Sequence, residues 1–306
     1  MPTVVRLPEA AADAQAVVAD TNIEDMMNKK ELLRVLEKLG MRPGRGLGQN
    51  FLIDNNLLDW IVRRNAPVEG EDVLEVGPGF GALTRKLLEC GINVTAVEFD
   101  HRIAEYLRSE LAVPNLHLIE ADACHVDYAE LFPAGRKFRS IANLPYSIST
   151  IFIAKMLELE NAPVEMFFML QKEMGERLAA EPGSKAYGAL SVRCAFRYEV
   201  KIEKIVPPTV FYPAPEVESA LVSFKLKKDA SNDIALLRRA TGIVKSLFLQ
   251  RRKQMGKILA SSYGKENVEA ALEKVGLTWE TRPDKVPYQK FIELAEALQS
   301  AQQEKQ

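Results

Sequence analysis

The amino-acid sequence predicts an α/β fold, in which a mostly parallel sheet is covered by helices on both faces and followed by a smaller all-helical C-terminal domain. The first observation is that short β-branched or apolar runs alternate with helical periodicity between residues 72 and 170. The second is that only helical periodicity remains after residue 227. The third is that no apolar run approaches the roughly 18 residues needed to span a bilayer. We therefore expect no membrane contact.

Each expected element has its own signal. A helix over residues 28–39 is ended by Gly40, and apolar residues at helical spacing indicate a second helix, namely Leu57, Leu58, Ile61 and Val62. The expected parallel strands are 72–76, 93–98, 116–119, 140–142 and 166–170, and the helices between them are 82–90, 102–111 and 151–159. Residues 190–198, 201–206 and 220–226 resemble strands joined without long helices, which predicts an antiparallel edge.

The chain is expected to divide into three parts. Residues 1–27 are rich in alanine and net acidic, which predicts a disordered acidic extension. Residues 28–228 form the α/β domain, and residues 229–306 form the helical domain, with the boundary near residues 228–233.

Composition excludes several classes of protein. The three cysteines lie far apart, so we expect neither disulfides nor a metal site, and a cytoplasmic location. The formal net charge of −2 taken as an average disfavours a nucleic-acid partner, yet residues 234–265 hold eight cations and no acid. Local patches rather than the whole-chain sum govern phosphate binding.

A glycine-rich turn connects the first expected strand to its helix, with the sequence Val73-Leu74-Glu75-Val76-Gly77-Pro78-Gly79-Phe80-Gly81. Glycine lets the backbone turn sharply and approach a ligand closely. Glu98 ends the next strand, where a carboxylate can accept both hydroxyls of a ribose. The spacing is not that of a phosphate-binding loop, which disfavours a dinucleotide site.

This acidic-then-glycine pattern resembles motif I of the Rossmann-like class I methyltransferases. The resemblance implies S-adenosyl-L-methionine (AdoMet) as cofactor. It further implies that Gly77 and Gly79 line the methionine part, that Glu98 holds the ribose and that Asp122 holds the adenine amino group.

A second motif, Asn143-Leu144-Pro145-Tyr146, follows the strand 140–142. Proline fixes the turn, which aims the Asn143 side-chain oxygen and the Leu144 carbonyl at one point. Two such acceptors suit an exocyclic amine, and Tyr146 can stack on a base extracted from RNA. The motif resembles that of the amino-methyltransferases, whose target is an exocyclic nitrogen.

Together these segments resemble the ribosomal-RNA adenine N6-dimethyltransferases, and most closely the branch that acts on small-subunit (16S) rRNA. The matching segments span about residues 45–290 and include residues 47–52, 75–81, 120–123, 143–150, 170–173, 183–191, 207–219 and 250–253. The resemblance adds Asn50 and Leu52 to the cofactor site, and makes Phe211 the second aromatic residue, which sandwiches the adenine against Tyr146. It implies transfer of two methyl groups to each of two adjacent adenines in the 3′-terminal hairpin.

The partner expected from this resemblance is small-subunit rRNA or a pre-30S particle, bound by a monomer. Two alternatives stay open: a large-subunit (23S) rRNA methyltransferase that confers macrolide resistance, and a ribosome-assembly factor that has lost catalysis. The intact set of Gly77, Glu98, Asp122 and Asn143 argues against the second.

The helical domain supports RNA binding without reference to any family. If residues 234–262 are treated as one helix, six cations fall within one arc of roughly 140°; they are Arg238, Arg239, Lys245, Arg252, Lys253 and Lys257. Arg251 alone lies on the apolar side, which indicates a local break or a buried ion pair. Because no acid interrupts the arc, we predict that these seven cations bind RNA.

Overall fold

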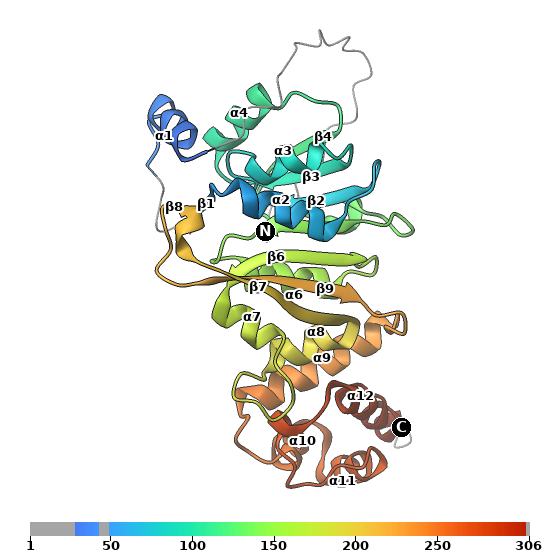
Figure 1. The fold of residues 1–306 in the computed structure, drawn as a ribbon. Helices are drawn as coiled ribbons and strands as arrows, with labels where there is room; N and C mark the ends of the chain where they lie inside the picture. Colours follow the sequence, from blue (N-terminus) through green and yellow to red (C-terminus); the bar gives the residue numbers. More distant parts are fainter. Residues whose placement is uncertain (1–27, 43–48, 304–306) are drawn as a thin grey trace.

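The computed structural model describes residues 28–42 and 49–303 (Figure 1). The expected extension at residues 1–27 lies outside them, as do Leu47 and Gly48 of the first matching segment.

A seven-stranded sheet with the strand order β4-β3-β2-β5-β6-β9-β7 forms the upper part of the molecule in Figure 1. Its strands are β2 (Asp72–Val76), β3 (Asn93–Glu98), β4 (Leu116–Glu120), β5 (Arg139–Asn143), β6 (Glu165–Gln171), β7 (Tyr198–Val206) and β9 (Ser219–Leu226). Strands β2 to β6 are parallel, whereas β9 runs antiparallel to both β6 and β7. The predicted parallel sheet and its antiparallel edge are therefore both confirmed.

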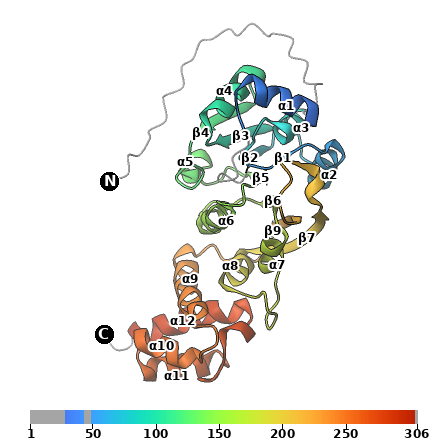
Figure 2. The same ribbon diagram turned by 90° about the vertical axis from the view of Figure 1, so that its left-hand side faces the viewer.

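Helices cover both faces of this sheet, as predicted. Neighbouring strand residues point to opposite faces, so Phe167 packs with α2 (Asn55–Asn65) and α3 (Ala82–Leu88), while Phe168 packs with α5 (Tyr128–Leu131) and α6 (Ser149–Glu158). Figure 2 shows the two pairs of helices on opposite sides of the sheet. Two helices, α5 and α7 (Lys172–Leu178), were not predicted.

The strand predicted at residues 190–198 is wrong, because this segment is mainly the helix α8 (Ala189–Arg197). Apolar residues alternate along it, which imitates a strand. In the helix they serve two different cores: Leu190 and Cys194 face the sheet, whereas Val192 and Phe196 face the C-terminal helices. A helix that is buried on two sides loses the one-sided periodicity on which the prediction depended.

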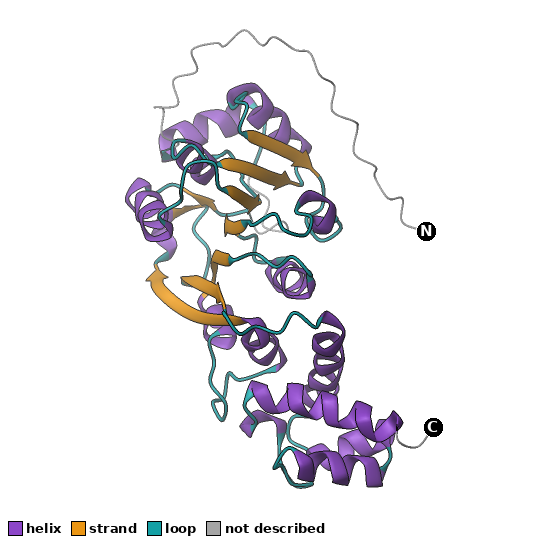
Figure 3. Cartoon of the chain, turned by 90° about the vertical axis from the view of Figure 1, so that its right-hand side faces the viewer, coloured by secondary structure: helices purple, strands orange, loops and turns teal. Residues whose placement is uncertain are grey.

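The part that follows β9 contains only helices and loops among the residues described (Figure 3). Its helices are α9 (Ile234–Leu249), α10 (Met255–Tyr263), α11 (Lys265–Lys274) and α12 (Tyr288–Gln303). The single helix assumed over residues 234–262 is wrong, because α9 and α10 are separate. The local break that Arg251 indicated is confirmed: α9 ends at Leu249, and the amide of Lys253 donates to the carbonyl of Gln250 at 2.7 Å in a turn before α10.

The remaining elements enclose the ligand edge of the sheet. Helix α1 (Lys29–Lys38) begins at Asn28, whose side chain accepts from the amides of Lys30 and Glu31, and it matches the predicted first helix. Its buried face, which includes Leu32, packs against α4 (His101–Glu110). The short strands β1 (Phe51–Leu52) and β8 (Phe211–Tyr212) pair with each other beside it. Among the described helices, none has the length and apolar character to cross a membrane.

Candidate active site

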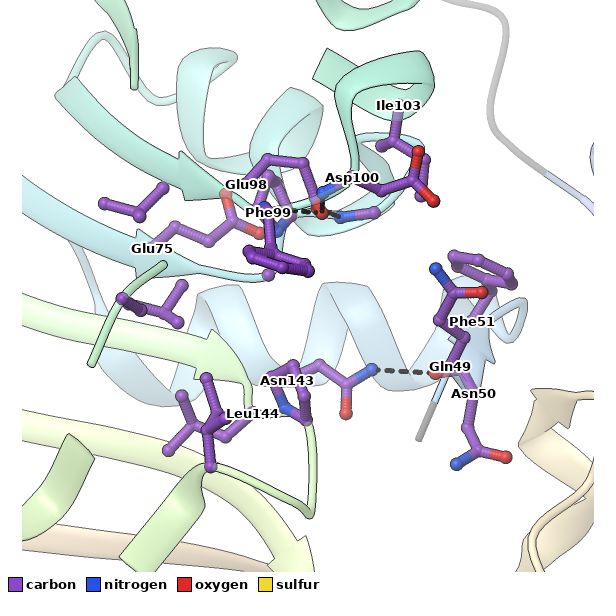
Figure 4. Close-up of a pocket in the computed structure, with 18 of the residues that line it drawn as sticks. Gln49, Asn50, Phe51, Glu75, Glu98, Phe99, Asp100, Ile103, Asn143 and Leu144 are labelled. Carbon is purple, nitrogen blue, oxygen red and sulfur yellow. Dashed lines mark hydrogen bonds between the residues drawn. The ribbon is translucent and has the colours of Figure 1, made fainter. Parts of the chain in front are cut away.

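A cavity of about 300 Å³ lies beyond the carboxyl ends of β2, β3, β4 and β5 (Figure 4). This is the point at which the chain order of the sheet reverses, where open α/β sheets bind their ligands. The volume falls at the lower end of the range for small-molecule sites. Seven residues that line the cavity are those predicted to bind the cofactor: Asn50, Leu52, Gly77, Gly79, Glu98, Asp122 and Asn143.

The glycine turn has a tightly packed backbone conformation that residues with a Cβ atom could not adopt. Gly77 and Gly79 have φ values of +67° and +54°, which L side chains rarely adopt. A Cβ atom on Gly77 would lie 2.9 Å from Cγ of Pro145, and one on Gly79 would lie 3.0 Å from the ring of Phe51. The turn therefore requires glycine at both positions.

Glu98 is held rigidly at the end of β3. Its Oε1 atom accepts hydrogen bonds from the amides of Phe99 and Asp100, both at 2.8 Å, and its Oε2 atom accepts one from Gly79 at 3.3 Å. The residue is only 6% exposed. Burial raises the pKa of this carboxyl, and the three amides oppose the rise. Oε1 has both lone pairs engaged, whereas Oε2 can still accept another hydrogen bond.

Glu75 also lines the cavity, although sequence reasoning gave it no role of its own. It is 1% exposed, and no described residue is a hydrogen-bond partner of its Oε2 atom. Burial raises the pKa of Glu75 to about 8, and the negative charge of Glu98 adds to this rise. Glu75 therefore carries a proton at neutral pH. Its position as the first residue of the glycine motif was the signal available in the sequence.

Asp122 follows β4 in a tight turn. One carboxylate oxygen accepts from the amide of Cys124 at 2.8 Å, and the other lies 2.8 Å from Nδ1 of His125. Partial burial opposes ionisation, but these hydrogen bonds prevail and lower the pKa of Asp122. Phe99 lines the same cavity with an aromatic side chain that is 64% exposed, and it was not predicted from the sequence.

Asn143 ends β5 with its side chain fixed in one orientation. The amide nitrogen Nδ2 donates to the carbonyl of Asn50 at 3.1 Å, so Oδ1 is the atom that remains to accept from a ligand (Figure 4). Leu144 and Tyr146 line the same cavity. The hydroxyl of Tyr146 lies 2.7 Å from that of Ser219, and burial raises the pKa of Tyr146.

Phe211 is not brought into the cavity. Its side chain is 3% exposed and packs with Val206 and Leu221 in the core beneath β8. Its neighbour Tyr212 is partly exposed, with the ammonium of Lys29 lying 5.4 Å from the centre of its ring. A sandwich of the base between Tyr146 and Phe211 stays a prediction, and it requires Phe211 to move.

The structure separates the seven cations predicted to bind RNA. Three line an open groove of about 640 Å³ between α9 and α10, and they are Arg252, Lys253 and Lys257. Arg282 lines it too, and was missed because it lies far along the chain. Arg251 instead donates to the carbonyl of Lys185 at 3.2 Å and lies 3.9 Å from Asp284. Outside the groove lie Arg238, Arg239 and Lys245; Arg238 lines a small hollow against α6 and α8.

Comparison with known proteins places these features in a wider set. The family model described as ribosomal RNA adenine dimethylase matches residues 43–300. The chain is 40% identical, over 263 residues, to the ribosomal RNA small subunit methyltransferase A of Magnetococcus marinus, covering 85% of this chain and 94% of that protein. It is 38% identical, over 258 residues, to the protein of the same name from Janthinobacterium sp., covering 84% of this chain and 98% of the other.

Two solved structures resemble the chain over most of its length. The 23S rRNA methyltransferase ErmE superposes with a TM-score of 0.63 at 26% identity, covering 82% of this chain and all of that one. A dimethyladenosine transferase from Plasmodium falciparum superposes with a TM-score of 0.69 at 23% identity, covering 82% and 98% of the two chains.

Proposed function

The chain belongs to the ribosomal RNA adenine dimethylase family, and from this we propose that it transfers methyl groups from AdoMet to N6 of two adjacent adenines in the 3′-terminal hairpin of small-subunit (16S) rRNA. It acts in ribosome biogenesis, in the cytoplasm, as a monomer on small-subunit rRNA or a pre-30S particle. The observation that carries this proposal is the orientation of Asn143: its hydrogen bond to Asn50 turns an acceptor oxygen towards a ligand in the cavity.

The residues of the cavity fit AdoMet. Gly77 and Gly79 line it with a backbone that could not carry a Cβ atom without meeting Pro145 or Phe51, and Oε2 of Glu98 is left to accept from a ribose hydroxyl. The unpartnered, buried Oε2 atom of Glu75 gives the cavity a polar atom that a polar group of the ligand would satisfy. Asp122 offers carboxylate oxygens to an adenine amino group. When bound, AdoMet supplies an electrophilic methyl group on a sulfonium leaving group.

The catalytic part of the site needs positioning more than acid–base strength. The Asn143 side-chain oxygen and the Leu144 carbonyl hold the two hydrogens of the target amine. Accepting these hydrogens, two before the first transfer and one before the second, would favour a pyramidal nitrogen with an available lone pair, and the proton displaced in each transfer would leave to solvent. Orienting reactants in this way supplies a large part of the barrier reduction without a strong general base.

The target adenine has to leave its helix or loop to reach Asn143. Tyr146 lies in the cavity wall beside Leu144, so its ring can stack on the extracted base. Its hydrogen bond to Ser219 fixes the ring in position. Phe211 completes the sandwich when it leaves the core.

We also propose that residues 229–306 form an RNA-binding domain. The groove between α9 and α10 presents cations from separate parts of the chain, and no acid is among the described residues that line it. Phosphate binding needs such uncompensated positive charge. This surface holds the ribosomal particle while the cavity, at the other end of the molecule, performs the chemistry.

The small-subunit target has more support than the large-subunit alternative. The relatives named for the small subunit reach 40% identity, whereas the 23S enzyme of known structure reaches 26%. The non-catalytic alternative has little support, since the cavity retains every predicted cofactor residue.

Mass spectrometry of rRNA tests the proposal directly. A strain that lacks the gene should lose N6,N6-dimethyladenosine from two adjacent positions of 16S rRNA, and the wild-type gene should restore it. A gene that encodes Asn143→Ala should not. Unchanged 16S rRNA, or a loss confined to 23S rRNA, would overturn the assignment.

A further inference from the structure

The turn that carries Asp122 is held from outside the cavity. This turn, residues 121–126, joins β4 to α5 and has Asp122 as its only carboxylate. The Cys124 amide donates to Asp122 itself, so the Asp122 side chain is oriented only if the peptide of Cys124 is fixed. What fixes that peptide therefore controls the direction of the carboxylate.

The hydroxyl of Tyr128 holds that peptide group at its Ala123 carbonyl, and Lys155 of α6 holds the two carbonyls that follow, those of Cys124 and Val126. The Nζ atom of Lys155 donates to the carbonyls of Cys124 and Val126, at 2.9 Å each, on the two sides of His125. The same ammonium lies 5.5 Å from the centre of the Tyr128 ring, and the hydroxyl of Tyr128 donates to the carbonyl of Ala123 at 2.9 Å. Lys155 has no acidic partner within ion-pair distance among the described residues. Its ammonium group donates instead to the backbone carbonyls of this turn.

Helix α6 also carries the other half of the site. It begins at Ser149, and the hydroxyl of Ser149 donates to the carbonyl of Tyr146 at 3.1 Å in the catalytic turn. One rigid helix thus holds the turn of Asn143 to Tyr146 at its start and the turn of Asp122 through Lys155, one and a half turns further along.

We propose that Lys155 is a positioning residue, which aims Asp122 at the adenine amino group of the cofactor and ties that turn to the catalytic turn. This inference rests on the proposed function, because it takes Asp122 as the acceptor for adenine. Lys155 itself is not among the residues that line the cavity. Its effect is therefore on recognition of the amino group and not on binding of the rest of the cofactor.

That distinction gives a test that a merely structural lysine would fail. The probes are S-adenosylhomocysteine and its analogue with an unsubstituted purine base, which lacks the 6-amino group. Calorimetry with the full chain gives the ratio of their affinities. A hydrogen bond from the amino group to a carboxylate makes the wild-type ratio about ten-fold or more.

Lys155→Met should lower this ratio at least about three-fold through weaker binding of the adenosine compound, while affinity for the purine analogue is unchanged. Lys155→Gln, which keeps a donor, should give an intermediate ratio, and it serves as the second variant if Lys155→Met does not fold. Glu158→Gln is the matched control, since Glu158 lies on the same helix but pairs with Arg193 at 2.8 Å. It should leave the ratio at the wild-type value.

The outcome for Asp122→Ala, which removes the acceptor, separates the two claims. If Asp122→Ala abolishes the ratio but folded Lys155 variants retain it, the positioning role is wrong and the adenine assignment stands. An equal loss of affinity for both probes in the Lys155 variants also overturns the role. If Asp122→Ala retains the ratio, the adenine assignment itself fails, and the role of Lys155 with it.

Discussion

The cavity at the sheet edge holds acidic side chains and the groove between α9 and α10 holds basic ones, and the two regions position them in opposite ways. In the cavity, acids such as Glu75 and Glu98 are almost fully buried, and backbone amides orient the second of them. In the groove, Arg252, Lys253 and Lys257 are exposed on a turn and a helix end. The difference shows two kinds of recognition. A small cofactor needs hydrogen-bonding groups that are fixed in direction, whereas a polyanion needs only a sufficient density of positive charge.

The largest expected effect is on the rate of methylation, and it comes from a substitution of Asn143 in the cavity. Asn143→Ala removes an acceptor that strengthens its interaction as the transition state forms, so single-turnover methylation should fall by about a hundred-fold or more. Binding of small subunits should stay at the wild-type level, because the groove is unchanged. A near-normal single-turnover rate in the folded variant would show that the active site has been misplaced.

Glu98 should give the next largest effect, confined to the cofactor. Glu98→Ala removes charge-assisted hydrogen bonds of ~1.5–3 kcal/mol, which corresponds to about a ten- to a hundred-fold weaker affinity for AdoMet. Glu98→Gln is the matched control: it keeps one acceptor oxygen and the volume, so it should lose less. Calorimetry that finds wild-type affinity in a folded Glu98→Ala variant would remove Glu98 from the site.

Much of the sheet could be predicted because its signals are local. The strand at Asp72–Val76 is a β-branched run closed by Gly77, and both its bounds were predicted. The glycine motif and the Asn143 turn were found for the same reason, since contiguous residues carry each signal. Segment 190–198 failed because its alternation arises from two packing partners, which only the folded chain reveals.

The parts of the site that sequence reasoning missed depend on contacts between distant segments. Lys155 matters only because α6 packs against the turn after β4, and Arg282 only because its loop returns to α10. Phe211 is the reverse case: its motif predicts a base contact, which stays a prediction, while the structure buries its ring. A motif identifies the residue type that is needed, but not whether its side chain is buried or exposed in the folded chain.

A charge reversal in the groove should give a smaller effect, which falls on binding to small subunits and not on the cofactor. Arg252→Glu with Lys253→Glu should weaken binding to small subunits. It should also reduce the slope of log affinity against log salt concentration by ~0.7–0.9 for each lost phosphate contact. AdoMet affinity should be untouched. The matched control is Lys265→Glu with Lys274→Glu, which changes the net charge equally on exposed positions of α11, outside the groove. Equal weakening in both double variants would reduce the groove to a general charge effect.

The smallest effect on methylation is expected from Glu75→Gln, which should instead change how the stability of the protein depends on pH. Burial raises the pKa of Glu75 to about 8. Between about pH 5 and 8 the folded chain therefore keeps the proton on Glu75, while the unfolded chain releases it above its ordinary value of 4.5. The folded state therefore binds more protons, so raising the pH costs stability.

Glutamine imitates the protonated acid and does not titrate. The unfolding free energy of Glu75→Gln should therefore exceed that of the wild type by an amount that grows, by about 1 kcal/mol per pH unit, from roughly pH 5 to 8 and then levels off. Chemical denaturation without AdoMet measures this difference. Glu280→Gln, at an exposed glutamate, is the control and should show no such slope. A difference that is constant with pH would mean that Glu75 is ionised in the folded protein, and that the cavity accommodates a buried negative charge before any cationic ligand arrives.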